Sequence, residues 1–137
     1  MADPIWLTRK ILDAMHFDQI QKFGGQLGVR DEHLIESSLA RPRQRLNYQP
    51  DSDIAALAAS YGYGLAGNHG YVDGNKRIAF MAMYVFLFIN GWELLAPEEE
   101  VVDIVLELAA GDLTESALAE WVKKNTILRE DCPPSLS

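Results

Sequence analysis

One stretch restricts the possible folds of this 137-residue chain more than any other. A polar, glycine-containing segment, residues 69–77, is followed directly by twelve residues without a charge, 78–89. A membrane span needs roughly 20 apolar residues, so this run is too short to cross a bilayer. It is typical of a helix buried on all sides, with Asn90 and Gly91 as the stop signal. We therefore predict a buried central helix whose first turn follows the polar segment.

The expected start of that helix carries groups that bind phosphate. If the helix begins near Gly74 or Asn75, the amides of Gly74, Asn75 and Lys76 have no partners within the first turn. The helix dipole places a partial positive charge there, and Lys76 and Arg77 add two full charges. These residues also fit a common turn pair followed by surface cations. Two cations at the positive end of a helix repel its dipole, so a bound anion is the simpler interpretation.

His69 and Asp73 supply the groups for chemistry beside this anion site. A histidine imidazole is a suitable general base for a hydroxyl, although a lone histidine is more often a packed or surface residue. Asp73 can bind Mg²⁺ together with phosphate oxygens, or it can cap the helix. A P-loop is excluded because Asn75 and Arg77 stand where that motif needs Gly and Ser/Thr. A zinc site lacks a convincing third ligand.

Capping residues and apolar periodicity predict five further helices around the central one. Their expected N-terminal signals are Thr8, Asp31, Ser52 or Asp53, Pro97 and Thr114. Their expected stops are Gly24, Arg41 with Pro42, Gly67, Gly111 and Lys124. The second helix is expected to be short and residues 92–95 to be an extended connector. The fold class is thus a six-helix all-α domain over residues 1–125, with a mobile polar tail over 126–137.

Residues 41–50 form the only basic cluster outside the motif. Pro42 and Pro50 bound most of it, so we expect an exposed loop or a short hairpin. Its arginines, Arg41, Arg43 and Arg45, could be ordinary surface charge. They could also approach the phosphates or a protein substrate.

Charge and cysteine content restrict the partners and the compartment. The net charge is −8, and residues 97–137 hold 3 Lys/Arg against 10 Asp/Glu. This acidic third argues against direct DNA binding and is compatible with a solvated helix face or a basic protein partner. No window is long enough for a membrane span, and the N-terminus lacks the regions of a signal peptide. With Cys132 as the single cysteine, we expect a cytoplasmic protein.

The motif and several flanking stretches resemble a known family. His-Gly-Tyr-Val-Asp-Gly-Asn-Lys-Arg at 69–77 is similar to the Fic-domain signature, His-x-Phe-x-Asp/Glu-Gly-Asn-x-Arg. It resembles more closely the death-on-curing (Doc) branch, which has Asn-Lys-Arg where typical Fic enzymes have Asn-Gly-Arg. The similarity extends over about residues 7–125. It includes residues 16–20, 23–25, 28–31, 39–42 and 89–92.

This resemblance implies a toxin of a bacterial type II toxin–antitoxin module. Doc toxins act as protein kinases that use Mg²⁺ and ATP on a threonine of elongation factor Tu, which halts translation. By position, His69 would deprotonate the target Ser/Thr hydroxyl, and Asp73 would hold the metal ion or orient that hydroxyl. The resemblance also assigns the nucleotide phosphates to Gly74, Asn75, Lys76 and Arg77. Residues 41–50 fall where Fic proteins carry a flap that aligns the target.

Three departures from the Fic pattern bear on the activity. Tyr71 replaces the usual Phe, and Phe80 stands where AMP-transferring members have a second arginine. The side chain of Lys76 takes room that outer phosphates would use, so a reversed nucleotide and phosphoryl transfer fit better than AMP transfer. The chain also lacks an inhibitory Ser/Thr-x-x-x-Glu-Gly/Asn helix, so restraint is expected from an antitoxin segment that folds on the domain. AMP transfer and a catalytically vestigial antitoxin-binding module remain the alternatives.

Overall fold

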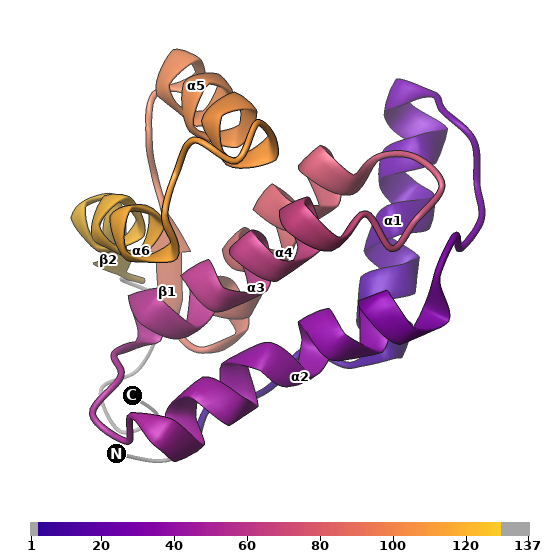
Figure 1. Cartoon of the computed structure of the whole chain (residues 1–137). Coiled ribbons are helices and arrows are strands. Elements are labelled where there is room, and N and C mark those ends of the chain that lie inside the picture. The colour runs from indigo at the N-terminus through magenta and orange to yellow at the C-terminus, as the bar shows by residue number, and fades with distance from the viewer. Residues whose placement is uncertain (1–2, 130–137) are drawn as a thin grey trace.

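Six helices and two short strands make up residues 3–129, the part of the chain that the computed structural model describes (Figure 1). The helices are α1 (Arg9–Phe23), α2 (Glu32–Tyr48), α3 (Ile54–Asn68), α4 (Asn75–Ile89), α5 (Glu98–Ala109) and α6 (Glu115–Lys124). The strands are β1 (Trp92–Leu94) and β2 (Thr126–Leu128). The predicted all-α domain is confirmed. Within the described residues, none of the helices has the length and apolarity needed to cross a membrane.

Four of the six helices begin at the capping residues that the sequence indicates. In each case a side-chain oxygen accepts a hydrogen bond from the amide three residues further on. The pairs are Thr8 with Ile11, Asp31 with Leu34, Asp53 with Ala56 and Thr114 with Ala117. Local chemistry therefore determines where these helices begin.

α3 is the helix around which the others pack. It contacts α2, α4, α5 and α6, and 11 of its 15 residues are buried. Small side chains permit this close packing. A Cβ at Gly62 would lie 2.5 Å from the Met83 sulfur on α4, and one at Gly64 would lie 3.1 Å from Arg41 Cδ on α2.

The prediction that α4 is buried on all sides is wrong in part, because the face of α4 that includes Phe80 is only half-buried.

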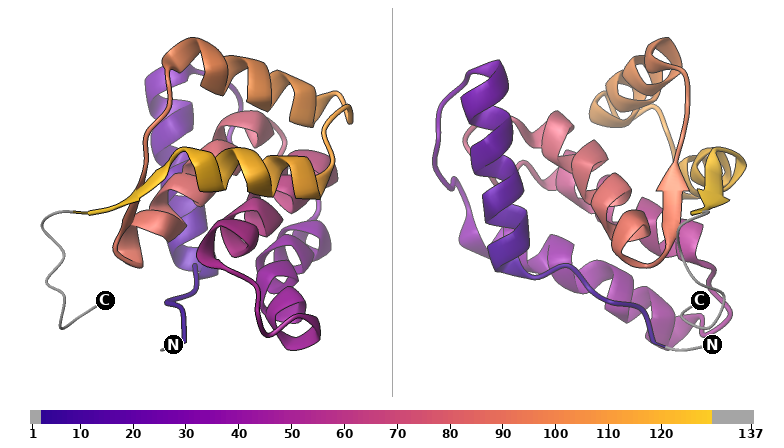
Figure 2. Two further views of the ribbon diagram at one scale, coloured as in Figure 1. Left: turned by 90° about the vertical axis from the view of Figure 1, so that its left-hand side faces the viewer. Right: turned by 180° about the vertical axis from the view of Figure 1, so that it is seen from behind.

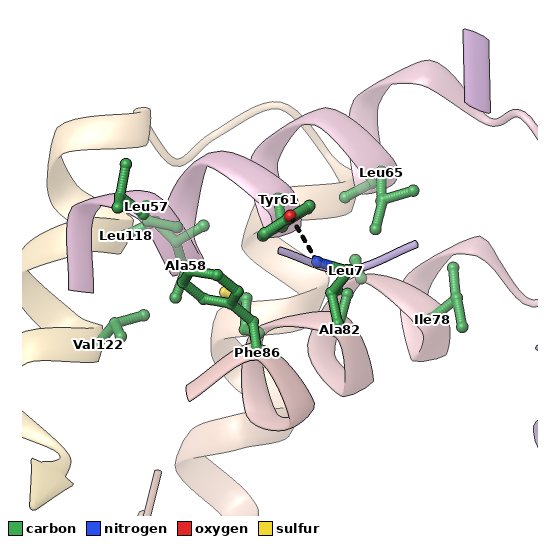
Figure 3. Close-up of a cluster of buried hydrophobic side chains, with 14 of the residues drawn as sticks. Leu7, Leu57, Ala58, Tyr61, Leu65, Ile78, Ala82, Phe86, Leu118 and Val122 are labelled. Atoms are coloured by element: carbon green, nitrogen blue, oxygen red, sulfur yellow. Dashed lines mark hydrogen bonds between the residues drawn. The ribbon is translucent and has the colours of Figure 1, made fainter. Parts of the chain in front are cut away.

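The main core lies where the N-terminal segment, α3, α4 and α6 meet. Figure 3 shows Phe86 of α4 among side chains from all four, including Leu7, Tyr61 and Val122. The Tyr61 ring lies 5.0 Å from that of Phe86, and its hydroxyl oxygen accepts a 3.1 Å hydrogen bond from the Leu7 amide. Seen from behind in Figure 2, α1 and α2 lie on one side of α4, and α5, α6 and the strands lie on the other. The core holds α4 firmly, so its first turn has a fixed position.

The expected loop or hairpin at 41–50 is not formed, because α2 continues through Pro42 to Tyr48. Pro42 cannot donate to the carbonyl four residues earlier, but its ring is fully buried and Leu46 packs on the core beyond it. Arg41, directly before the proline, and Arg45, three residues after it, both pair with Glu115 at the start of α6. Burial and these ion pairs outweigh the single hydrogen bond that the proline removes.

Residues 126–128, the start of the predicted mobile tail, form the short strand β2. β2 pairs antiparallel with β1, with Trp92 opposite Leu128 and Leu94 opposite Thr126. Pairing of two distant three-residue segments has little local signature, so periodicity did not reveal it. The rest of the predicted tail, residues 130–137, lies outside the described residues.

Candidate active site

The polar motif forms the loop between the end of α3 and the start of α4. His69 is the C-cap residue of α3 and has left-handed backbone angles, φ 51° and ψ 49°. It is the only non-glycine residue with positive φ among residues 3–129. Such a conformation costs of order 1–3 kcal/mol and persists only where the surroundings impose it. The backbone of the expected general base is therefore held in a specific, strained shape.

The first turn of α4 has the geometry expected of an anion site. Gly74 is the N-cap, has a left-handed φ of 77° and supplies no capping side chain. The Gly74 carbonyl already accepts the Ile78 amide at 3.0 Å. The amides of Asn75 and Lys76 thus begin the helix without a side-chain cap, next to the charges of Lys76 and Arg77.

The Asn75 side chain closes the motif loop, a role additional to the phosphate contact expected of its backbone amide. Its amide nitrogen donates to the Tyr71 carbonyl at 2.9 Å, and its oxygen accepts the Tyr71 amide at 3.0 Å. These two bonds close the loop over four residues. Phosphate contact by Asn75 would therefore come from its backbone amide, with the side chain fixing the loop.

Asp73 presents an exposed carboxylate beside this turn. Oδ1 accepts the Gly74 amide at 2.9 Å, and Oδ2 accepts the Gln26 amide at 3.3 Å. A Cβ at Gly25 would lie only 2.8 Å from Oδ2, so the residue at 25 must be small for the two loops to meet. The described residues contain no group of three His, Cys, Asp or Glu that could hold a metal by itself. One exposed carboxylate fits Mg²⁺, which is commonly held by one or two carboxylates with substrate phosphates and water.

His16 of α1 supports the loop from beneath, a role that sequence reasoning left open. The ring is buried, and Nε2 donates to the Asp73 carbonyl oxygen at 2.7 Å. It also stacks on the Tyr71 ring at 3.8 Å and 12°. The Tyr71 hydroxyl in turn donates to Asp13 at 2.6 Å. Burial, and then the adjacent Asp13 carboxylate, raise the pKa of Tyr71 well above its usual value.

A cleft of about 800 Å³ opens over the motif. One end is polar and is built from the first turn of α4, and the other is apolar and is built from α4 and α5. Phe23 of α1 forms part of its rim, with the Arg77 guanidinium 4.9 Å above its ring. The lining residues from outside the motif are Gln19, Phe23, Phe80, Met81, Glu98, Val101, Val102, Val105 and Leu106. A nucleotide would fit this arrangement with its phosphates at the polar end and its base at the apolar end.

All six predicted motif residues line this one cleft: His69, Asp73, Gly74, Asn75, Lys76 and Arg77. The three arginines of α2 do not line it. Arg41 and Arg45 pair with Glu115, Arg41 also lies over Tyr63, and Arg43 lies over Trp6. In this structure the three arginines connect α2 to the elements packed beside it.

Comparison with known proteins agrees with this site. A sequence model of the Fic/DOC family matches residues 6–87. Toxin Doc of Mycolicibacterium smegmatis (strain ATCC 700084 / mc(2)155) is 39% identical over 101 residues, which cover 71% of this chain and 77% of that protein. Protein kinase doc of Escherichia phage P1 is 28% identical over 113 residues, covering 82% of this chain and 89% of that protein. The matched segment spans α1 to α3, the whole motif loop and most of α4, and the chain belongs to the Fic/DOC family.

Proposed function

We propose that this chain is a Doc-like toxin that transfers the γ-phosphoryl group of Mg·ATP to a serine or threonine hydroxyl of a target protein. The observation that carries the proposal is the shared cleft, which His69, Asp73, Lys76 and Arg77 line together at the start of α4. The names Toxin Doc and Protein kinase doc of the two relatives support it. The complete motif favours an enzyme over a vestigial binding module.

In the proposed reaction His69 accepts the proton of the target hydroxyl as its oxygen attacks the γ-phosphorus. The bond from that phosphorus to the β,γ-bridging oxygen breaks, and ADP leaves with the oxygen. The amides of the first turn of α4, with Lys76 and Arg77, stabilise the negative charge of the transferred group. Phosphoryl transfer depends mainly on such positioning and charge stabilisation. The left-handed backbone of His69 is part of that positioning.

Asp73 is the residue that would hold Mg²⁺ in this cleft. A bound Mg²⁺ would neutralise phosphate charge and orient the transferred group. The carboxylate is exposed and already accepts two amide hydrogen bonds, so it has a fixed direction and free lone pairs. If Asp73 only orients the target hydroxyl, its replacement would lower the rate without changing the Mg²⁺ concentration that the reaction needs.

Transfer of the γ-phosphoryl group is favoured over AMP transfer by Lys76 and Phe80. For AMP transfer the α-phosphate must lie beside His69, and the outer phosphates then lie further along the start of α4. There the cleft wall is Phe80, which offers no charge, while the apolar side chains of α4 and α5 follow. A reversed nucleotide puts the γ-phosphate against the cations and the nucleoside against the apolar wall.

The proposed partners are elongation factor Tu as target and an antitoxin as inhibitor, both met in the bacterial cytoplasm. Exposed apolar side chains at the cleft, Phe23, Val102 and Leu106, support an inhibitory segment that folds on this face. The acidic start of α5 suits basic residues in such a segment. The net acidic chain remains a poor candidate for binding DNA itself.

The experiment that tests this proposal compares two labelled nucleotides. The purified protein is incubated with Mg²⁺, elongation factor Tu and ATP labelled in either the α- or the γ-phosphate. We expect label from the γ position only, and a mass increase of one phosphate on the target. His69→Ala should reduce the rate by roughly 10²–10⁴-fold, which is the typical contribution of a general base. His33→Ala is the matched control, because His33 is an exposed residue of α2 outside the cleft.

Other results would redirect the assignment. Label from the α position would move this chain to AMP transfer. If elongation factor Tu takes no label, the same assay with a bacterial lysate in its place tests whether another protein is the target. Absence of label from either nucleotide in the lysate would contradict the enzymatic proposal.

A further inference from the structure

The segment that joins α1 to α2 binds three successive carbonyls at the end of α3. The two segments run side by side, and Val29 and Tyr71 form an isolated antiparallel bridge (Figure 1). The Arg30 guanidinium donates from Nη2 to the Asn68 carbonyl at 3.0 Å and from Nε to the His69 carbonyl at 2.7 Å. The Arg30 amide donates to the next carbonyl, that of Gly70, at 2.9 Å. One residue thus holds the backbone on both sides of the α-carbon of His69.

These hydrogen bonds supply donors to carbonyls at the end of α3 that have no partners within the helix. The last carbonyls of a helix lack partners within the helix, and the helix dipole makes that end negative. A guanidinium offers several N–H groups in one plane and so binds two neighbouring carbonyls at once. His69 is also in the left-handed conformation, which a non-glycine residue keeps only when its surroundings impose it. Arg30 supplies part of that constraint.

The contacts of Arg30 are concentrated on this loop. Its side chain is exposed, and among residues 3–129 it pairs with no carboxylate. Loss of the guanidinium therefore removes no core packing and breaks no ion pair. Its main structural effect falls on the Asn68 and His69 carbonyls.

We propose that Arg30 is a positioning residue that fixes His69 for proton transfer at the cleft. The inference rests on the proposed function, in which His69 is the general base. Without the guanidinium, the His69 backbone can relax from the left-handed conformation, and its imidazole then samples directions away from the target hydroxyl. The first turn of α4, held by the core, keeps its place and continues to bind the nucleotide.

The test separates turnover from nucleotide binding. Arg30→Ala should lower kcat for phosphoryl transfer by roughly 10–100-fold, the range expected when a catalytic group is misplaced by about 1 Å. The KM for ATP should change by less than about twofold. Arg30→Lys keeps the charge but cannot donate to both carbonyls in the same geometry, so it should fall between wild type and Arg30→Ala. Lys22→Ala is the charge-matched control, because it removes a surface cation paired with Asp18 outside the cleft.

Chemical rescue and amide exchange distinguish positioning from general destabilisation. Guanidinium or methylguanidinium at millimolar concentration should restore part of the kcat of Arg30→Ala and none of that of His69→Ala. Hydrogen exchange at the Tyr71 amide should accelerate in Arg30→Ala, while exchange at buried amides of α3 stays unchanged. This second measurement does not depend on the reaction. If wild type transfers no phosphate yet the Tyr71 amide responds, the proposed function fails but the structural constraint stands.

Two results would overturn the inference. One is an Arg30→Ala protein whose kcat and Tyr71 exchange equal those of wild type. The other is a loss of kcat that matches the fraction of unfolded protein and is not restored by guanidinium. Either result would mean that the other hydrogen bonds of the loop hold His69 without Arg30.

Discussion

The substitution Gly70→Ala tests the close packing of the motif loop against α2. An alanine Cβ at position 70 would overlap Cγ1 of Ile35 and lie 3.2 Å from the Ile35 backbone nitrogen and 3.4 Å from Cδ1. Favourable carbon contacts begin at about 3.5 Å, and Ile35 is fully buried. The loop must therefore move away from α2, or the Ile35 side chain must leave its rotamer. Movement of the loop would stretch the two hydrogen bonds that Arg30 and Asp31 amides donate to the Gly70 carbonyl.

The expected cost follows from these two responses. An off-rotamer side chain costs about 0.5–1.5 kcal/mol, and each weakened backbone hydrogen bond up to about 1 kcal/mol. We therefore expect Gly70→Ala to lower the free energy of unfolding by about 2–3 kcal/mol, within the usual range for overpacking. The measurement is urea denaturation followed by tryptophan fluorescence. Activity should fall as well, because the displaced loop carries His69.

Two further variants make the reasoning refutable. Gly67→Ala is the matched control, because a Cβ at this α3 position meets nothing within 4 Å, and it should be neutral or stabilise by up to about 1 kcal/mol. In a background of Ile35→Ala, which removes the overlapping Cγ1, Gly70→Ala should cost close to nothing. If Gly70→Ala is as stable as wild type, or costs the same in both backgrounds, contact with Ile35 does not restrict position 70.

Three further predictions follow from contacts around the site and the core. Tyr71→Phe removes the hydroxyl that donates to Asp13 and should cost about 1–2 kcal/mol at neutral pH. Because the pKa of Tyr71 is raised in the folded state, its stabilisation is complete below about pH 10 and is lost as the unfolded tyrosine ionises above it. Unfolding of the variant should therefore be less sensitive to pH above 10, as denaturation across pH 8–11 would reveal. Glu115→Ala leaves Arg41 and Arg45 without their carboxylate and should lower the melting temperature by several degrees, about 1–3 kcal/mol. Asp73→Asn should raise the Mg²⁺ concentration needed for half-maximal phosphoryl transfer at least tenfold while the melting temperature changes little, whereas an unchanged requirement would exclude Asp73 as the metal ligand.

Much of the fold could be predicted because its signals are local. A side-chain cap such as Asp53 is recognised from the residues that follow it, and a run without charges at 78–89 fixes the position of α4. The anion site at Gly74 is local in the same sense, since a helix start exposes its own amides. The six motif residues could therefore be predicted together from one stretch of sequence.

The remaining features depend on partners distant in the chain. Pro42 is a helix breaker by local rules, and only its burial and the bonds from neighbouring arginines to Glu115 explain why α2 continues. His16 reaches the Asp73 carbonyl across 57 positions, and Arg30 reaches His69 across 39. Neither residue carries a pattern that reveals its partner. Residues that support a site from a distance are thus the part that periodicity and spacing miss.

The two walls of the cleft differ in stiffness, because α5 is anchored to the domain more weakly than α4 is. Leu108 is the only buried residue of α5, and one hydrogen bond from Trp121 Nε1 to Glu100, 2.7 Å long, ties its start to α6. The opposite wall, α4, is built into the core. An occupant wider than the resting cleft can therefore be accommodated by displacement of α5 without distortion of the phosphate end. We expect amides of α5 to exchange faster than those of α4, and any ligand that reaches Val102 and Leu106 to slow them. Affinity for such a ligand would then depend as much on how easily α5 can be ordered as on the contacts that the ligand gains.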